Sequence, residues 1–166
     1  MSIGIIQGRL TPSHGIIQKF PDKQWLEEFS IAKKLGLDYV ELLADASFNK
    51  ENPLWTGEKL NGVQQGLIQN GLIPYSLCVD HIMSRPLTVG DLSEQEKSYQ
   101  DLITIIKHGS LCGVTHFILP FLEGASLKDN KEMIVRGRDV LFRLLKDIPG
   151  HSSFFCIETD LSLIHI

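Results

Sequence analysis

Five short apolar segments recur along the chain, beginning near residues 2, 38, 73, 114 and 154, and an amphipathic helical segment follows each of the first four. Each strand-plus-helix unit takes about 35 to 41 residues, somewhat more than the average unit of an eight-fold barrel. Strands that alternate with helices are joined by right-handed crossovers and form a parallel sheet. The pattern therefore predicts an α/β protein with about five parallel strands and four helices.

Two architectures suit this alternation. One is part of a (β/α)8 barrel, and the other is a five-stranded doubly wound sheet, which fits a length of 166 residues. The best-known nucleotide-binding form of the doubly wound sheet needs a glycine-rich turn after its first strand. The segment Gln7-Gly8-Arg9-Leu10 supplies a single glycine at that place, so this version is disfavoured.

Local signals set the predicted boundaries of the elements. Apolar residues at helical spacing predict a helix over 24–35, which Gly36 ends. Ser93, with Glu96 three residues later, matches the capping box that begins the third helix. Val114–Leu119 is rich in residues that favour strands and predicts the fourth strand.

The fifth predicted strand carries the residue with the clearest chemical interest. The apolar run Phe154-Phe155-Cys156-Ile157 leads directly into the carboxylate of Glu158. In a parallel α/β protein the carboxyl ends of the strands are where active sites lie, because the loops that leave the sheet converge there. A polar residue at the start of a loop is the plainer interpretation of Glu158.

Composition narrows the functional classes. The chain has 16 basic and 20 acidic residues, a net charge of -4 and no long run of either sign. This balance argues against nucleic-acid binding, since phosphate binding needs a clustered basic face. No apolar run approaches the roughly 20 residues that span a bilayer, and no secretory signal is visible. The three cysteines are far apart, so we expect reduced thiols in a cytoplasmic protein rather than a disulfide framework or a thiolate metal site.

Motifs at the five strand ends resemble the xylose isomerase-like barrels of sugar isomerases and epimerases. The resemblance spans nearly the whole chain, and the order of the motifs makes it more specific than any one of them. The motifs are Ile6-Gln7-Gly8-Arg9-Leu10-Thr11-Pro12, Tyr39-Val40-Glu41-Leu42, Leu77-Cys78-Val79-Asp80-His81, Ile118-Leu119-Pro120-Phe121 and Ile157-Glu158-Thr159-Asp160.

The resemblance implies a (β/α)8 TIM barrel with a divalent metal, Mn²⁺, Mg²⁺ or Co²⁺, held at its carboxyl-terminal face. Glu158 matches the first metal ligand of that family, and an Asp, a His and a Glu on strands six to eight would complete the set. A barrel of this type needs about 250 residues, so we expect residues 1–160 to be the N-terminal part of a single TIM-barrel domain, truncated after strand five. One carboxylate cannot hold such an ion, so we expect the chain by itself to be inactive.

Residues 161–166, Leu161-Ser162-Leu163-Ile164-His165-Ile166, match the translation of a transposon adapter used in DNA library preparation. We therefore interpret this segment as an artefact and exclude it, together with its histidine, from functional assignment. A natural loop after the fifth strand is the alternative. Resequencing of the locus decides between them, since an in-frame continuation in place of this segment would establish the artefact.

The implied reaction moves a proton on a carbon next to the carbonyl of a sugar or sugar phosphate. Glu158 would bind the metal and act on the substrate carbon. His81 is a candidate to donate a proton or to bind a hydroxyl group, although a structural loop histidine is the plainer interpretation. Four further residues are candidates for substrate binding at the same end of the barrel, namely Gln7, Arg9, Glu41 and Asp80.

Two other functions remain open. An apurinic-site endonuclease shares the barrel and a metal cluster, but it needs a histidine on strand four, which ends here in Leu119-Pro120, and a basic surface for DNA. A non-catalytic half-barrel that binds sugar or serves a structural role would have to cover two open sheet edges, normally by pairing with another copy. The sequence does not predict the oligomeric state.

Overall fold

Parallel strands and helices alternate through the whole described chain. The computed structural model describes residues 2–12, 15–16, 18–128, 130–148 and 153–160. Residues 161–166, interpreted above as an artefact, lie outside the described residues. The elements in order are β1 (Gly4–Ile6), α1 (Trp25–Lys34), β2 (Tyr39–Ala44), α2 (Pro53–Thr56), α3 (Leu60–Gln69), β3 (Ser76–Val79), α4 (His81–Ser84), α5 (Leu92–Leu111), β4 (His116–Phe121), a 3-10 turn (Glu123–Ala125), α6 (Lys131–Asp147) and β5 (Phe154–Thr159).

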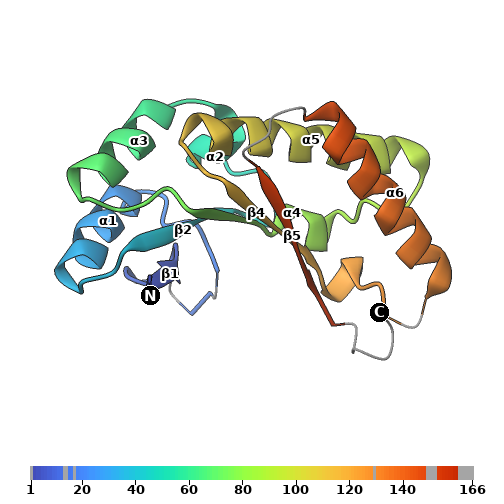
Figure 1. Cartoon of the computed structure of the whole chain (residues 1–166), viewed down its shortest axis with the longest axis horizontal. Helices are drawn as coiled ribbons and strands as arrows, with labels where there is room; N and C mark the ends of the chain where they lie inside the picture. Colours follow the sequence, from blue (N-terminus) through green and yellow to red (C-terminus); the bar gives the residue numbers. More distant parts are fainter. Residues whose placement is uncertain (1, 13–14, 17, 129, 149–152, 161–166) are drawn as a thin grey trace.

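The strands form one open parallel sheet in the order β1-β2-β3-β4-β5, as the sequence predicts for part of a barrel. A doubly wound sheet reverses its strand order at a switch point, so this sequential order excludes that alternative. Figure 1 shows the helices arranged along one side of the curved sheet. The register includes the pairs Ile6 with Glu41, Leu43 with Cys78, Cys78 with Ile118, and Pro120 with Glu158.

The hydrophobic core lies between the sheet and the helices. Alternate strand residues point to opposite faces, and the residues of β2, β3 and β4 that face the helices are at most 2% exposed. These residues are Val40, Leu42, Ala44, Leu77, Val79, Phe117, Leu119 and Phe121. The intervening positions therefore line the opposite, inner face of the sheet, which includes Glu41, Ser76 and Cys78.

An aromatic row crosses the inner face near the amino-terminal ends of four strands. The rings of Tyr39 and Tyr75 have centroids 5.2 Å apart, and the ring of His116 stacks between Tyr75 at 4.3 Å and Phe154 at 4.9 Å. Gly4 on β1 faces the ring of Tyr39, where a Cβ atom would clash with it. This row forms the floor below the polar residues described next.

The long helices agree with the predicted ones, with differences at their ends. In the described residues there are four helices of ten or more residues, α1, α3, α5 and α6, and α2 and α4 are additional single turns. The predicted capping box at Ser93 is wrong: Asp91 caps α5, and its partner is Glu94. The fourth strand begins two residues later than predicted, at His116, and it continues through Pro120.

None of the helices in the described ranges combines the length and the apolar character needed to cross a bilayer.

Candidate active site at the carboxyl ends of the strands

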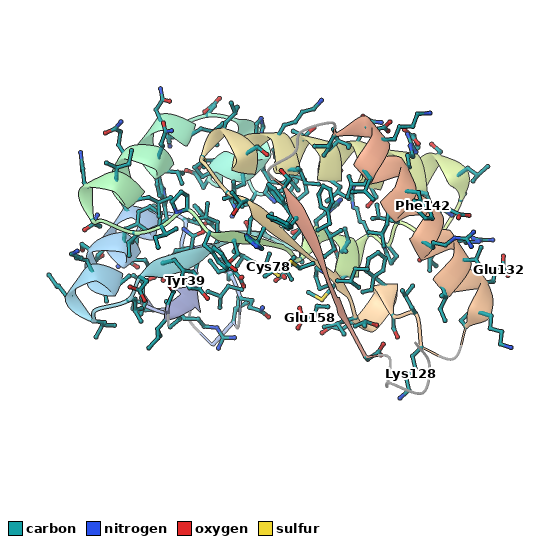
Figure 2. The ribbon with its side chains drawn as sticks, viewed as in Figure 1. Tyr39, Cys78, Lys128, Glu132, Phe142 and Glu158 are labelled. Carbon is teal, nitrogen blue, oxygen red and sulfur yellow. The ribbon has the colours of Figure 1, made fainter. Side chains whose placement is uncertain are left out.

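Three carboxylates predicted as site residues lie on the inner face of the sheet. Asp80 directly follows β3 and Glu158 is the penultimate residue of β5, both at the carboxyl ends, whereas Glu41 lies in the middle of β2. Figure 2 shows Glu158 and Cys78 on the side of the sheet away from the helices. The charge of Glu158 raises the pKa values of both Glu41 and Asp80, so the three groups share one electrostatic environment.

Burial dominates the acid–base properties of this cluster. Burial, together with the charges of Asp45, Glu158 and Glu41, raises the pKa of Asp80 to about 6, against a hydrogen bond from Cys78 that lowers it. Burial also raises the pKa of Glu41, whose carboxylate accepts a hydrogen bond from the hydroxyl of Ser76 at 2.6 Å. Asp80 can thus carry a proton near neutral pH, as a general acid requires.

Cys78 lies within the same cluster. Its thiol donates a hydrogen bond to the carboxylate of Asp80, with Sγ and Oδ1 3.2 Å apart. Burial, followed by the charge of Asp80, raises the pKa of this thiol far above its usual range. Cys78 therefore stays a neutral donor that orients Asp80, and it is not an activated nucleophile.

Gln7 and Arg9 follow β1 at the same end of the sheet. The side chain of Gln7 is buried, and its Oε1 accepts a hydrogen bond from the backbone N–H of Leu43 at 3.3 Å. Its Nε2 has no hydrogen-bond partner among the described residues, which leaves a donor free at this end of the sheet. Arg9 is exposed and forms no ion pair within the described residues.

Glu28 holds the loop that carries these two residues, and the sequence analysis missed it. Its carboxylate is fully buried and accepts hydrogen bonds from the backbone N–H groups of Gly8, Leu10 and Thr11 and from the Thr11 hydroxyl, at 2.8 to 3.1 Å. The spacing of Trp25, Glu28 and Ala32 puts Glu28 on the apolar face of α1. An acid on that face is the signal that would have identified it.

His81 lies apart from the three carboxylates. Its ring is buried, packs edge-on against Trp55 with centroids 4.9 Å apart, and its Nε2 lies 3.3 Å from the Ser98 hydroxyl and 3.7 Å from the Asp101 carboxylate. Burial lowers its pKa. These neighbours belong to α2 and α5, so the structure does not bring His81 to Glu158, and its catalytic role stays a prediction.

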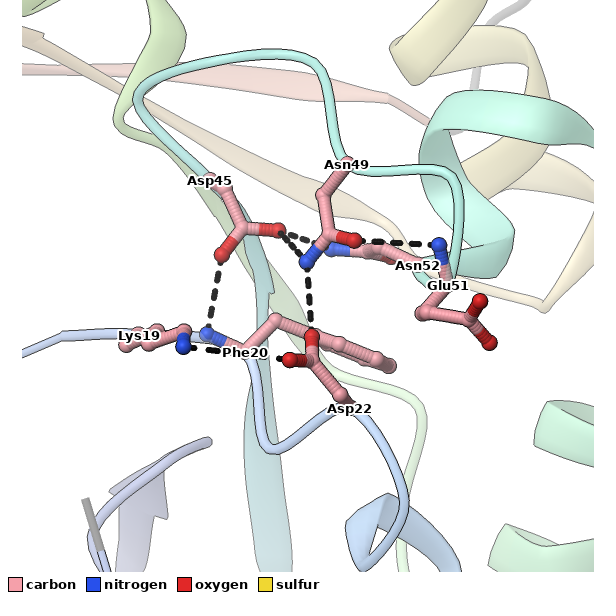
Figure 3. A network of polar contacts seen from close by, with 7 residues as sticks. All are labelled: Lys19, Phe20, Asp22, Asp45, Asn49, Glu51 and Asn52. Atoms are coloured by element: carbon pink, nitrogen blue, oxygen red, sulfur yellow. Dashed lines mark hydrogen bonds and ion pairs between the residues drawn. The ribbon is translucent and has the colours of Figure 1, made fainter. Parts of the chain in front are cut away.

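Asp45 extends the polar region outward, and it too was missed (Figure 3). Its carboxylate accepts hydrogen bonds from the backbone N–H of Phe20 at 2.9 Å and from the amide groups of Asn49 and Asn52 at 3.2 and 2.9 Å. It joins the loop after β1 to the loop after β2. Asp45 directly follows a strand, the same pattern that singled out Glu158, and this signal was available in the sequence.

The described residues do not form a metal centre by themselves. No three His, Cys, Asp or Glu side chains within the described ranges come together in a way that could hold an ion. Carboxylate oxygens suit Mg²⁺ or Mn²⁺, but such ions need about six ligands. The described part of the chain therefore supplies no more than individual ligands.

Comparison with known proteins identifies relatives that act on sugars. The chain is 29% identical over 89 residues to a protein of Haemophilus influenzae named as an L-ribulose-5-phosphate 3-epimerase, a match that covers 52% of this chain and 31% of the relative. No family model matches the sequence. The chain superposes over its full length on 54% of a D-psicose 3-epimerase crystallised in the presence of D-fructose, with a TM-score of 0.71 and 13% identity.

A second solved structure agrees. The 3-keto-D-glucoside 4-epimerase of Escherichia coli matches 95% of this chain with a TM-score of 0.65 and 16% identity. The resemblance to the xylose isomerase-like barrel family is confirmed. The chain spans about half the length of the two solved structures that it matches. Its five strands form one open parallel sheet that corresponds to part of a TIM barrel, as predicted.

The same comparisons bear on the other functions considered. The matched proteins of the xylose isomerase-like barrel family are named for epimerase activities on sugars or sugar phosphates. The endonuclease alternative gains no support from them.

Proposed function

We propose that this chain belongs to a sugar or sugar-phosphate epimerase or isomerase that moves a proton on a carbon next to a carbonyl. The observation that carries the proposal is the convergence of Glu41, Asp80 and Glu158 on the inner face, in a fold shared with sugar epimerases. Two carboxyl groups in different environments, one buried and one exposed, can serve as acid and base.

The roles follow from burial. Glu158 is exposed, so its side chain can reach the carbon and remove the proton. Asp80 is 3% exposed and has a pKa raised to about 6, so it can hold a proton and donate it to the carbonyl oxygen as negative charge develops there. Return of a proton to the opposite face of the same carbon gives the epimer, and return to the neighbouring carbon gives the isomer.

Glu41 and Gln7 would orient the substrate beneath these groups. Glu41 already accepts a hydrogen bond from Ser76, and the free Nε2 of Gln7 can donate to a sugar hydroxyl. Arg9, exposed at the rim, would bind a peripheral oxygen or a phosphate group. His81 remains a candidate for a second proton carrier, a role that requires the sugar to reach its ring beneath α5.

A divalent ion remains part of the proposal as a cofactor, with Glu158 as one ligand. When bound, such an ion would stabilise the enediolate charge. The described residues do not complete a cage for it, so no role assigned above depends on the ion. We also propose that the 166-residue chain alone does not turn over substrate.

Solvent exchange tests the function directly. A complete barrel that contains this sequence is incubated in D₂O with D-fructose or L-ribulose 5-phosphate, and deuterium at the carbon next to the carbonyl is measured by NMR. We expect exchange in the wild type and a loss of about a hundredfold or more for Glu158→Gln. Glu58→Gln, a change at an exposed residue after α2, is the control. Absence of exchange with ketoses and ketose phosphates, with and without Mn²⁺, would reject the proposal.

A further inference from the structure

A groove beside the carboxylate cluster has no part in the roles assigned so far. It has a volume of about 640 Å³ and is lined by residues 16, 18, 19 and 22 of the loop after β1 and by residues 45–50 of the loop after β2. Asp45 belongs to this lining, and it directly follows Ala44, whose carbonyl accepts a hydrogen bond from the backbone N–H of Asp80 at 3.1 Å. The groove therefore adjoins the carboxylate cluster, and a ligand that occupies both places would cross Asp45.

Hydrogen bonds fix the shape of the groove before any ligand enters. The amide of Asn49 donates to Asp45 at 3.2 Å and to Asp22 at 2.9 Å, so one side chain ties the two walls together (Figure 3). The ammonium group of Lys19 lies 3.8 Å from the carboxylate of Asp22. A site with walls that are already ordered loses less entropy when it binds.

Phe48 gives the groove an aromatic surface. Its side chain is 66% exposed, although large apolar side chains usually avoid water when packing permits. The ring is held edge-on by the buried Trp55, with centroids 5.7 Å apart and planes at 71°. An exposed ring among amide, carboxylate and ammonium groups suits a sugar ring, whose C–H face packs on the aromatic face while its hydroxyls bond to the polar groups.

The charge of the groove selects between an uncharged ring and a phosphate group. Its lining contains two lysines, Lys19 and Lys50, and two aspartates, Asp22 and Asp45, so it carries no surplus positive charge. Asp45 and Glu158 both add negative charge near Asp80, which repels an anion. Phosphate sites need clustered cationic donors, which this lining lacks.

We propose that this groove is a second sugar-binding site, which takes an uncharged sugar ring linked to the sugar held at the carboxylate cluster. The substrate class is then a glycoside or disaccharide with a free keto group, and Phe48 is the residue that selects it. This inference rests on the proposed function and narrows its substrate.

Three ligands that share one fructose unit test the proposal. The 166-residue chain is titrated with D-fructose, with isomaltulose, which carries a glucosyl ring on O6, and with D-fructose 6-phosphate, which carries a phosphate group on the same oxygen. Dissociation constants come from NMR or calorimetry. We expect isomaltulose to bind at least about fivefold more tightly than D-fructose, since aromatic packing contributes on this scale. D-fructose 6-phosphate should bind no more tightly than D-fructose.

Variants assign the gain to the groove. Phe48→Ala should remove the preference for isomaltulose and leave the affinity for D-fructose unchanged, and Phe48→Trp should keep the preference. Phe142→Ala is the matched control, because Phe142 on α6 is 64% exposed, almost as much as Phe48.

Each other outcome has a defined meaning. Equal affinity for D-fructose and isomaltulose would overturn the inference while leaving the proposed function intact, and so would tighter binding of the 6-phosphate that persists in Phe48→Ala. Failure of the complete barrel to exchange deuterium into any ketose would reject the proposed function. Phe48-dependent binding of isomaltulose would in that case still support the groove as a sugar site.

Discussion

Gly8 donates its backbone N–H to the Oε2 of Glu28 at 2.8 Å, although 20 residues separate them in the sequence. This bond joins the loop after β1 to the buried face of α1. The other carboxylate oxygen accepts from Leu10 and Thr11. The position of Gln7 and Arg9 at the candidate site therefore depends on Glu28, a residue of the first helix.

Glu28→Ala should destabilise the protein strongly. It would leave three backbone N–H groups and one hydroxyl without their acceptor, at a cost of about 3 to 5 kcal/mol in the free energy of unfolding. Urea denaturation measures the change, and amide hydrogen exchange should accelerate at Gly8, Leu10 and Thr11. The neighbouring Glu27 is exposed, so Glu27→Ala should change stability by less than about 0.5 kcal/mol. Equal effects of the two variants would contradict this account of the loop.

The start of α5 offers a test between two capping residues. Asp91→Ala should cost about 1 kcal/mol of unfolding free energy, since the Asp91 side chain accepts from the backbone N–H of Glu94 at 2.9 Å. Ser93→Ala should be close to neutral, because Ser93 lies inside the helix. Thermal denaturation of both variants measures the difference, and a larger loss for Ser93→Ala would restore the cap that the sequence pattern predicts.

Asp80 should make stability depend on pH. Its pKa is raised in the folded protein from 3.8 to about 6, so folding favours the protonated form. The stabilisation is complete below about pH 4 and is lost as the pH rises through about 6. Asp80→Asn should remove this dependence and raise the unfolding free energy at pH 7 by about 1 to 3 kcal/mol. Urea denaturation at a series of pH values tests it, and Glu58→Gln, a change at an exposed acid, should leave the profile unaltered.

The three cysteines should differ in reactivity. Burial raises the pKa of Cys112 to about 11 and that of Cys78 still further, and both thiols are buried. The thiolate is the reactive form, so iodoacetamide should modify the partly exposed Cys156 first under native conditions. Mass spectrometry of peptides measures the order, and Cys156→Ser should remove the fast phase. Early labelling of Cys78 would mean that the carboxylate cluster is open to solvent.

The positions of the strands could be predicted from the sequence because apolar runs, glycine stops and loop lengths are local signals. The fifth strand, Phe154–Thr159, occurs where it was expected. The cap of α5 could not be predicted reliably, since Ser93 with Glu96 and Asp91 with Glu94 both fit the same four-residue pattern. The backbone conformation at Asp91, which is extended, decides between them.

The site was harder to predict than the fold. Glu158 and Asp80 were singled out because strand ends are visible in the sequence, and their catalytic roles stay predictions. An acid on the apolar face of α1 marks Glu28 as unusual, but no local pattern indicates that its partner is a loop about 20 residues away. The direction of the His81 side chain depends on how α4 turns after β3. Asp80 and His81 are therefore adjacent in the sequence, but Asp80 lies on the inner face and His81 lies beneath α5.

Gly4 and Tyr39 share one small volume at the floor of the sheet. Because the Tyr39 ring lies where any side chain at position 4 would have to go, the two residues are not free to vary independently. Relatives with a larger residue at the first position should carry a smaller one at the second. Their joint substitution pattern would thus record, in sequences alone, that the first two strands lie in contact.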